Sequence, residues 1–181
     1  NSNWKFLIEN FIEPYHVQFV HKTTTNQPLK DHYTIVDGIC YGSGINVKKE
    51  DEKNSNALSV TSRYLSLFPN FIIANYFPNQ IGVYLNVPIS PGETIQKRII
   101  YTSDGKSMTE EESNTAKKIW WSVHKEDHKI CERLQEGRSS PASDQGGLLS
   151  PHWEKGVQAF QKLIINATMK SSKLKKGRKN V

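Results

Sequence analysis

The sequence predicts an α+β fold in which an antiparallel sheet packs against long helices. Residues 32–50 and 56–104 are rich in Ile, Val, Tyr and Phe and are interrupted by Gly, Pro and Asn, a pattern typical of short strands joined by turns. Helical patterns follow in residues 109–137 and after residue 150. Strands and helices do not alternate along the chain, which argues against a parallel, doubly wound sheet.

The strand region is expected to form an antiparallel meander. Residues 72–102 divide into three apolar segments, which are joined at the turn sequences "FPNQ" and "PISPGE". The charged segment 48–56, "KKEDEKNSN", is predicted to be an exposed loop at a hairpin tip.

The first long helix is predicted to begin at a capping box. Thr109 is followed three residues later by Glu112, the spacing at which the two side chains satisfy each other's backbone N–H groups. The helix is expected to extend to Gly137, with an interruption near His124 as an alternative to a continuous helix.

The second long helix is predicted to begin with Ser150 as its N-cap and Pro151 in its first turn. Apolar residues then recur at a spacing of three to four and predict a core-facing stripe: Trp153, Val157, Phe160 and Ile164.

Composition and charge indicate one globular domain with a basic tail. The chain has 181 residues, of which 36% are hydrophobic, enough for one compact core. Six of the 24 Lys and Arg residues lie in residues 170–181, so the rest of the chain has 18 basic and 18 acidic residues. We therefore expect a folded domain over residues 1–169, a disordered tail over residues 170–181, and no nucleic-acid partner.

Other classes of protein are disfavoured by the apolar runs and the cysteines. No apolar run approaches the roughly 18–20 residues that cross a bilayer, so no membrane association is expected. Cys40 and Cys131 lie far apart, without the spacing of a cysteine-ligated zinc or iron–sulfur site. Two isolated thiols suit a reducing compartment, and the predicted location is the cytoplasm.

One residue of the first long helix departs from its apolar stripe. A carboxylate occupies the fourth position of the face formed by Ala116, Trp120, Val123, Asp127, Ile130 and Leu134. An ionised carboxylate that faces a core is costly unless it is paired or bound to a metal. Asp127 is therefore a candidate ligand, with a frayed helix or a salt bridge to an arginine as the alternatives.

Two histidines near the start of the chain are candidate partners of this carboxylate. Pro14 suits the first turn of a helix that would include His16 and His21. Five positions on a regular helix leave the two rings roughly 140° apart, so they share a metal only beside the helix or on a distorted one. Two histidines and one carboxylate form the facial triad of mononuclear non-haem iron(II) enzymes.

The opening segment resembles the start of the catalytic domain in Rieske-type oxygenase large subunits (aromatic-ring-hydroxylating dioxygenases). The resemblance rests on an N-W-K entry, an E-N pair, an acidic residue three positions before Y-H, and a second histidine five residues later. These elements are Asn3-Trp4-Lys5, Glu9-Asn10, Glu13, Tyr15-His16 and His21. The later segments "KEDHKICERLQEGRSS", "LFPNFII" and "GLLSPHWEKGVQAFQ" also resemble the family, and the first of them points to Asp127 as the carboxylate ligand.

The resemblance implies a helix-grip (Bet v 1-like) domain that holds mononuclear Fe(II) on His16, His21 and Asp127. It implies O₂-dependent hydroxylation, dihydroxylation or oxidative dealkylation of a small molecule. Electrons would come from NAD(P)H through a reductase or ferredoxin and a [2Fe–2S] Rieske cluster. The cluster motif is absent here, and in the family its domain lies immediately upstream. By itself this chain is expected to bind iron without turning over, and the full-length protein is expected to be a homotrimer.

The resemblance also assigns roles to Glu13 and Asn10. Glu13 occupies the position that links the iron site to the Rieske cluster of a neighbouring subunit; the alternative is a glutamate that caps a helix. Glutamate there resembles the branch that acts on quaternary amines, while an aromatic substrate remains open. Asn10 is expected to lie beside the iron ligands, with a local backbone contact as its alternative.

Two other functions remain compatible with the sequence. Helix-grip domains also bind apolar small molecules without a metal, in which case His16, His21 and Asp127 would be unrelated polar residues. A family member that kept the fold and lost its redox function is the second alternative, and the intact ligand set argues against it.

Overall fold

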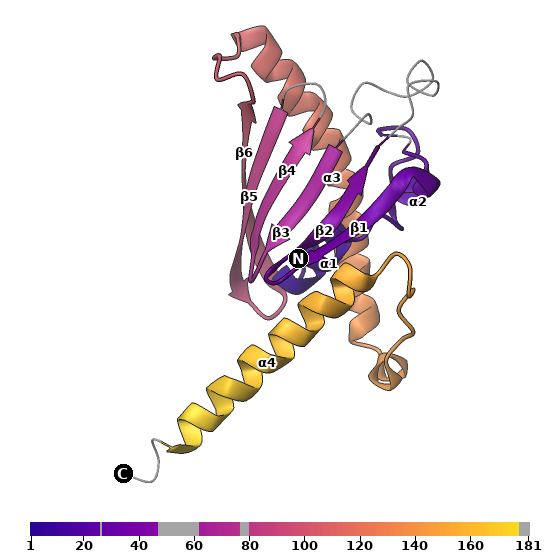
Figure 1. The fold of residues 1–181 in the computed structure, drawn as a ribbon, viewed down its shortest axis with the longest axis vertical. Coiled ribbons are helices and arrows are strands. Elements are labelled where there is room, and N and C mark those ends of the chain that lie inside the picture. The colour runs from indigo at the N-terminus through magenta and orange to yellow at the C-terminus, as the bar shows by residue number, and fades with distance from the viewer. Residues whose placement is uncertain (26, 47–61, 77–79, 178–181) are drawn as a thin grey trace.

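The computed structural model describes residues 1–25, 27–46, 62–76 and 80–177, and its architecture is α+β (Figure 1). One antiparallel sheet contains six strands in sequential order: β1 (His32–Asp37), β2 (Cys40–Ile45), β3 (Ser62–Leu67), β4 (Phe71–Tyr76), β5 (Gln80–Ser90) and β6 (Glu93–Thr102). The predicted fold class and the meander over residues 72–102 are therefore confirmed. The predicted loop 48–56 and residues 77–79 of the "FPNQ" turn lie outside the described residues.

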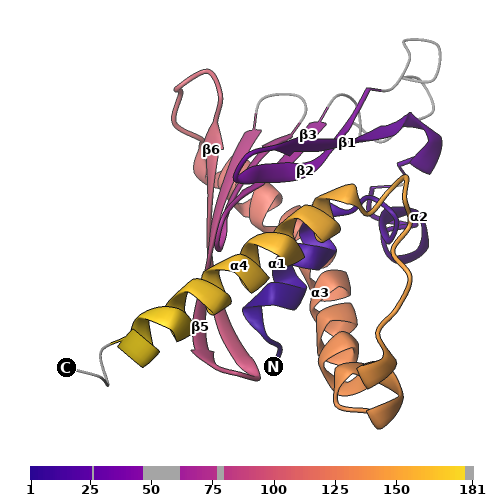
Figure 2. The same cartoon turned by 60° about the horizontal axis from the view of Figure 1, so that its bottom comes forward.

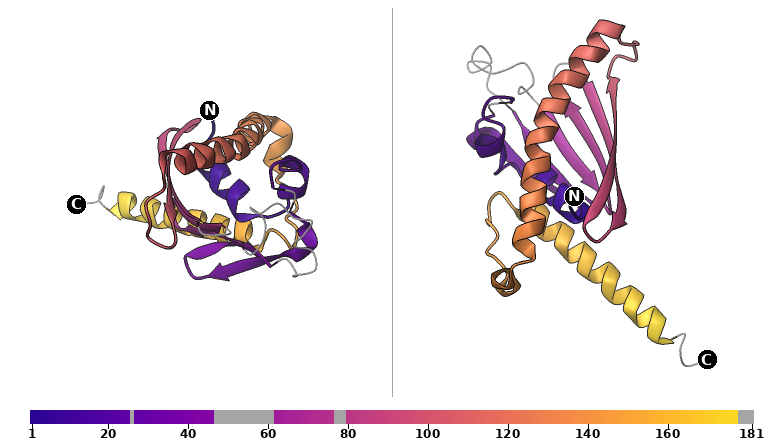
Figure 3. Two further views of the ribbon diagram at one scale, coloured as in Figure 1. Left: turned by 90° about the horizontal axis from the view of Figure 1, so that it is seen from above. Right: turned by 180° about the vertical axis from the view of Figure 1, so that it is seen from behind.

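The helices enclose a core against one face of this sheet. They are α1 (Trp4–Ile12), α2 (Val17–Val20), α3 (Glu110–Arg138) and α4 (Lys155–Gly177), with short 3₁₀ turns η1 (Leu29–Asp31) and η3 (Pro141–Gln145). Helix α3 crosses the sheet, and α1 contacts both α3 and strands β2, β3 and β5 (Figure 3). The core includes Ile8, Ile12, Tyr41, Ile72, Trp120 and Phe160.

Helix α3 begins as the sequence predicts. The Thr109 hydroxyl accepts a hydrogen bond from the Glu112 N–H, and the Glu112 carboxylate accepts one from the Thr109 N–H. The helix is continuous through His124, so the interruption considered from the sequence does not occur. The apolar stripe shifts near its end, where Cys131 is buried and Leu134 is exposed.

Helix α1 ends before the histidine motif, and the motif itself forms only a short helix. Helix α1 stops at Ile12, and Glu13 has an extended backbone with φ −103° and ψ 137°. The cause is Pro14, whose ring disfavours the helical conformation in the residue before it. A new four-residue helix, α2, then starts after His16 and ends before His21. The prediction that both histidines lie on one helix starting at Pro14 is therefore wrong.

Helix α4 differs from its prediction at both ends. Ser150 accepts hydrogen bonds from the N–H groups of His152 and Trp153, but regular helix begins only at Lys155, so Pro151 lies in a turn before it. The helix continues to Gly177 and projects beyond the sheet (Figures 1 and 2), whereas the sequence predicted disorder from residue 170. Lysine is a good helix former, and a helix already nucleated on the core extends at low cost.

Candidate metal centre

The two histidine rings lie close together on either side of the short helix α2. His16 is the residue before α2 and His21 is the residue after it, and their ring centroids lie 5.2 Å apart. On a continuous helix the rings would diverge by roughly 140°. His16 has helical backbone angles and the His21 backbone N–H donates to the Val17 carbonyl, so the two imidazoles meet by reaching around the side of α2.

Asp127 of α3 lies opposite these rings. Its Oδ1 atom is 3.0 Å from His21 Nε2 and 3.6 Å from His16 Nε2. One ligand atom from each of the three residues can be chosen so that all lie within 4.8 Å of one another. The Asn10 side-chain amide donates a hydrogen bond of 3.0 Å to the same Oδ1 atom. The structure thus brings together four of the site residues predicted from the sequence.

Two further carboxylates hold the opposite edges of the rings. Glu13 Oε1 lies 2.6 Å from His16 Nδ1, and Glu126 Oε2 lies 2.7 Å from His21 Nδ1. Glu126 also accepts a hydrogen bond of 2.7 Å from the Thr24 hydroxyl. A carboxylate that accepts Nδ1–H fixes the imidazole as the tautomer whose Nε2 lone pair is free for a ligand bond.

Glu13 makes the helix-capping contact considered from the sequence and also contacts the His16 ring, while its link to a neighbouring subunit stays a prediction. Its Oε2 atom accepts a hydrogen bond of 3.1 Å from the His16 backbone N–H, which lies at the start of α2. Its Oε1 atom contacts the His16 ring. One side chain therefore both supports the start of the short helix and orients the imidazole.

The electrostatics of the cluster favour a bound cation. Burial by itself lowers the pKa of His21, but the hydrogen bond and charge of Asp127, and then those of Glu126, raise it above its ordinary value. Burial likewise tends to raise the pKa of Asp127, yet the bond and charge of His21, followed by the charge of His16, hold it below its ordinary value. Three carboxylates around two imidazoles thus leave negative charge that a proton or a metal ion can neutralise.

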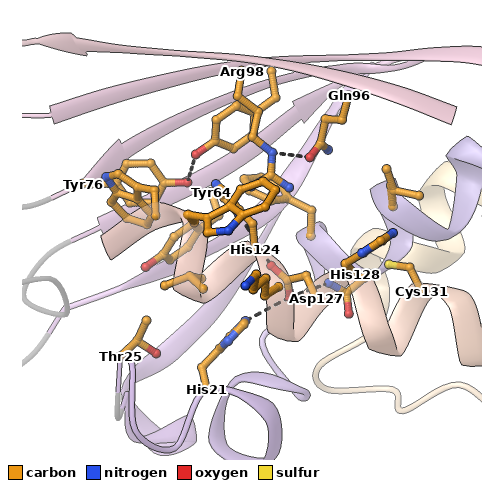
Figure 4. A pocket seen from close by; sticks show the side chains of 18 of the residues that line it. His21, Thr25, Tyr64, Tyr76, Gln96, Arg98, His124, Asp127, His128 and Cys131 are labelled. Carbon is orange, nitrogen blue, oxygen red and sulfur yellow. Dashed lines mark hydrogen bonds and ion pairs between the residues drawn. The ribbon is translucent and has the colours of Figure 1, made fainter. Parts of the chain in front are cut away.

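A cavity of about 1170 Å³ opens beside the cluster, between α3 and the sheet (Figure 4). Aromatic rings from both sides line it. The Tyr76 and Trp120 ring centroids lie 4.0 Å apart, and the hydroxyls of Tyr76 and Tyr84 are hydrogen-bonded at 2.7 Å. Tyr64, Phe11 and Trp121 also line it.

Sequence reasoning missed several of the residues at this site. Glu126 directly precedes Asp127, so its position in the sequence could have marked it as a candidate. Its contact is with His21, however, which lies 105 residues away in the sequence. His124 lies one turn before Asp127 and lines the cavity, with its Nδ1 atom 4.0 Å from Asp127 Oδ2. Arg98 projects into the cavity from β6, and no pattern in the sequence of that strand distinguishes it.

The family follows from a comparison with known sequences. Residues 1–169 match the family described as ring hydroxylating alpha subunit (catalytic domain). The chain belongs to this family. The predicted recognition of a Rieske oxygenase large-subunit catalytic domain is thereby confirmed.

Relatives of this ring-hydroxylating alpha-subunit domain include oxygenases of quaternary amines. The chloroplastic choline monooxygenase of Atriplex hortensis is 28% identical over 162 residues, which cover 88% of this chain and 36% of that protein. A crystal structure of the quaternary ammonium Rieske monooxygenase CntA with an inhibitor has a TM-score of 0.69 at 18% identity, covering 90% of this chain and 45% of CntA. A CntA structure with γ-butyrobetaine has a TM-score of 0.64 at 17% identity, covering 90% of this chain and 44% of CntA.

The structural likeness to CntA shows the fold alone at this level of identity, and the chain spans about a third of the length of its curated choline monooxygenase relative. Within the described residues, no helix has the length and apolar character needed to cross a bilayer. The predicted cytoplasmic location stays a prediction, since the choline monooxygenases are described as chloroplastic.

Proposed function

We propose that His16, His21 and Asp127 bind a mononuclear Fe(II), and that the complete protein hydroxylates or oxidatively dealkylates a quaternary amine with O₂. The observation that carries the proposal is the convergence of three ligand atoms within 4.8 Å. Two imidazole nitrogens and one carboxylate oxygen are the donor set of the iron(II) facial triad, which leaves coordination positions open. The two Nδ1 contacts, to Glu13 and Glu126, fit ligating histidines.

The residues of this chain prepare the centre for its chemistry. Bound iron would supply the activation of dioxygen. Glu13 and Glu126 hold the His16 and His21 rings with Nε2 toward the centre, and Asn10 orients the Asp127 carboxylate. The aromatic residues of the cavity offer an organic substrate an apolar surface beside the centre.

Support for a quaternary-amine substrate comes from the cavity and from the relatives. An ammonium group is attracted to the faces of Tyr and Trp rings, and Tyr64, Tyr76 and Trp120 line the cavity together. Choline monooxygenase and CntA are both named for quaternary-amine chemistry. An aromatic substrate is the second candidate, because the same rings offer stacking surfaces.

Electron delivery involves parts that this chain does not contain. We propose that a [2Fe–2S] Rieske cluster on another domain passes electrons from NAD(P)H, through a reductase or ferredoxin, to the iron centre. Glu13 would link that centre to the cluster of a neighbouring subunit in a homotrimer. The inter-subunit electron transfer described for CntA supports this arrangement. Residues 1–169 would then be the iron-binding catalytic unit.

The test is anaerobic titration of the metal-free chain with ferrous ion, followed by measurement of bound iron. We expect about one iron per chain, and a large loss of affinity when alanine replaces His16, His21 or Asp127. His128→Ala is the matched control, because His128 lies next to Asp127 but its side chain is 63% exposed and contacts Glu132. Absence of iron binding would support a metal-free binding module instead, and iron binding that survives all three ligand substitutions would refute the assignment of His16, His21 and Asp127 as the ligands.

A further inference from the structure

His124 is a histidine of α3 that faces the cavity beside the candidate metal centre. It lies one helical turn before Asp127, lines the cavity, and has a side chain that is 14% exposed. Its Nδ1 atom is buried and forms no hydrogen bond with the described residues. Its Nε2 atom also has no partner in the described part of the chain, and unlike Nδ1 it is accessible. His124 therefore offers a free ring nitrogen to a molecule in the cavity.

Two aromatic rings hold this imidazole in place. The Trp120 ring stacks with it, at a centroid distance of 6.1 Å and an interplanar angle of 26°. The Tyr84 ring meets it edge-on from the sheet, at 5.7 Å and 87°. Figure 4 shows His124 between Asp127 and the sheet residues that line the cavity. A ring packed on two sides has little freedom to change rotamer, so Nε2 has a defined position in the cavity.

The neighbouring carboxylate selects the tautomer of His124. Its Nδ1 atom is 4.0 Å from Asp127 Oδ2, which is too far for a hydrogen bond. At this distance the charge of the carboxylate still favours an N–H group over a lone pair on Nδ1. A neutral imidazole that carries its proton on Nδ1 has its lone pair on Nε2. Nε2 is therefore a hydrogen-bond acceptor that faces the cavity.

The polar atoms of the aromatic side chains around His124 are already paired. Trp120 Nε1 donates a hydrogen bond of 2.8 Å to Gln80 Oε1. The hydroxyls of Tyr76 and Tyr84 are hydrogen-bonded to each other at 2.7 Å. A largely apolar cavity fixes the orientation of its ligand through a small number of free polar groups. Nε2 of His124 is such a group, and it lies where the aromatic rings meet the candidate metal centre.

We propose that His124 Nε2 accepts a hydrogen bond from a hydroxyl group of the substrate, and that His124 is a specificity-determining residue. This inference rests on the proposed function, because it names a substrate group recognised at the same site. A quaternary nitrogen carries no N–H, so a quaternary amine supplies the donor through a hydroxyl, and an aromatic substrate supplies it as a phenol. Because His124 lies one turn from Asp127, the hydroxyl-bearing end of the substrate is held next to the candidate metal centre.

The experiment compares three probes: (3-hydroxyphenyl)trimethylammonium, its methyl ether and phenyltrimethylammonium. Each combines a quaternary ammonium with an aromatic ring, and only the first donates a hydrogen bond. Isothermal titration calorimetry measures their affinities for the metal-free and the ferrous-loaded chain. We expect the hydroxyl probe to bind roughly three- to tenfold more tightly than the other two, as one neutral hydrogen bond predicts. Equal affinities would show that Nε2 meets only water, and an equal gain for the ether would show that Nε2 is a donor. Either result, or no binding of any probe, would overturn the inference.

Variants then identify the residue responsible. His124→Phe keeps a flat ring against Trp120 and Tyr84 but has no acceptor, so it should abolish the preference for the hydroxyl probe. His124→Gln, whose amide oxygen accepts hydrogen bonds, should retain part of the preference. His128→Phe is the matched control, because His128 lines the cavity from the same helix but is 63% exposed and contacts Glu132. A preference that survives His124→Phe would show that another group binds the hydroxyl, and would refute the proposal.

Iron content separates this inference from the proposed function. It is measured for the unmodified chain and for each variant, in parallel with probe binding. Normal iron binding by an unmodified chain that shows no hydroxyl preference would overturn the role of His124 alone. A hydroxyl preference that depends on His124 in a chain that binds no iron would support that role and count against the metal centre.

Discussion

His32 makes the stability of this domain depend on pH in a way that can be calculated. It is the first residue of β1, is only 5% exposed, and has no hydrogen-bond partner among the described residues for either ring nitrogen. Burial, and then the charge of His16, lower the pKa of His32 from 6.5 to about 4. The folded state therefore keeps His32 neutral at a pH where the unfolded chain protonates it.

The sign and size of the effect follow from this difference. The stability is fully present above pH 6.5 and is lost as the pH falls from 6.5 toward 4, because the unfolded state binds the extra proton in that window. A difference of about 2.5 pH units corresponds to a limit of roughly 3 kcal/mol. Between pH 7 and 4.5 the expected loss is about 2 kcal/mol, which is a large fraction of the stability of an ordinary domain.

Urea unfolding of the metal-free chain and of His32→Gln at both pH values measures this contribution. Other groups titrate over the same range, so the quantity of interest is the difference between the two proteins. The free energy of unfolding of the unmodified chain should fall by about 2 kcal/mol more than that of His32→Gln, which cannot take up the proton. Parallel losses in the two proteins would show that His32 is solvated or paired, and would refute the reasoning.

Three further predictions concern the metal centre and the last helix. Glu13→Gln should lower ferrous affinity by about 10–100-fold, and in the complete protein it should suppress product formation more than iron content; near-normal turnover of the iron-loaded variant would rule out an electron-transfer role. Glu126→Gln should lower iron affinity to a similar extent, since it replaces the charged acceptor of His21 Nδ1–H with a weaker, neutral amide oxygen, and Glu132→Gln serves as a control at a partly exposed position of the same helix. Deletion of residues 170–181 should leave iron content and the melting temperature unchanged, because this part of α4 projects beyond the sheet; a large fall in melting temperature would show that it docks on the domain.

The sequence predicted correctly those parts of the fold that depend on interactions between residues close together in the chain. The capping box at Thr109 and Glu112 forms as expected, because its hydrogen bonds join residues three positions apart. The end of α1 before Pro14 is also a local effect, because proline disfavours a helical backbone in the preceding residue, whereas the sequence did not reveal that the next helix includes only Val17–Val20. The start of α4 at Lys155 was harder to predict from the sequence. Ser150 caps a turn, and whether that turn continues into a helix depends on packing against the core.

The candidate site was predictable only where its residues lie close together in sequence or fit a known pattern. His16 and His21 share one segment, and Asp127 was chosen by its position on an otherwise apolar face and by the resemblance of its surroundings to a family. Arg98 gave no comparable signal, because its place in the lining of the cavity depends on how the strands and helices come together in three dimensions.

The meeting of the two ligand segments depends on how α1 docks on α3. The Ser2 hydroxyl donates to the Cys131 carbonyl at 3.0 Å, and the Asn10 side chain donates to Asp127 at 3.0 Å. The residue nearer the N-terminus of the chain thus contacts the residue nearer the C-terminus of α3, as in an antiparallel pair of helices. These polar contacts fix the antiparallel register, because a shift of one helical turn, about 5.4 Å, would break both of them. The same shift would separate Asp127 from His21 by more than a ligand bond can span. The geometry of the candidate metal centre is thus set by the packing of α1 on α3 as well as by His16, His21 and Asp127 themselves.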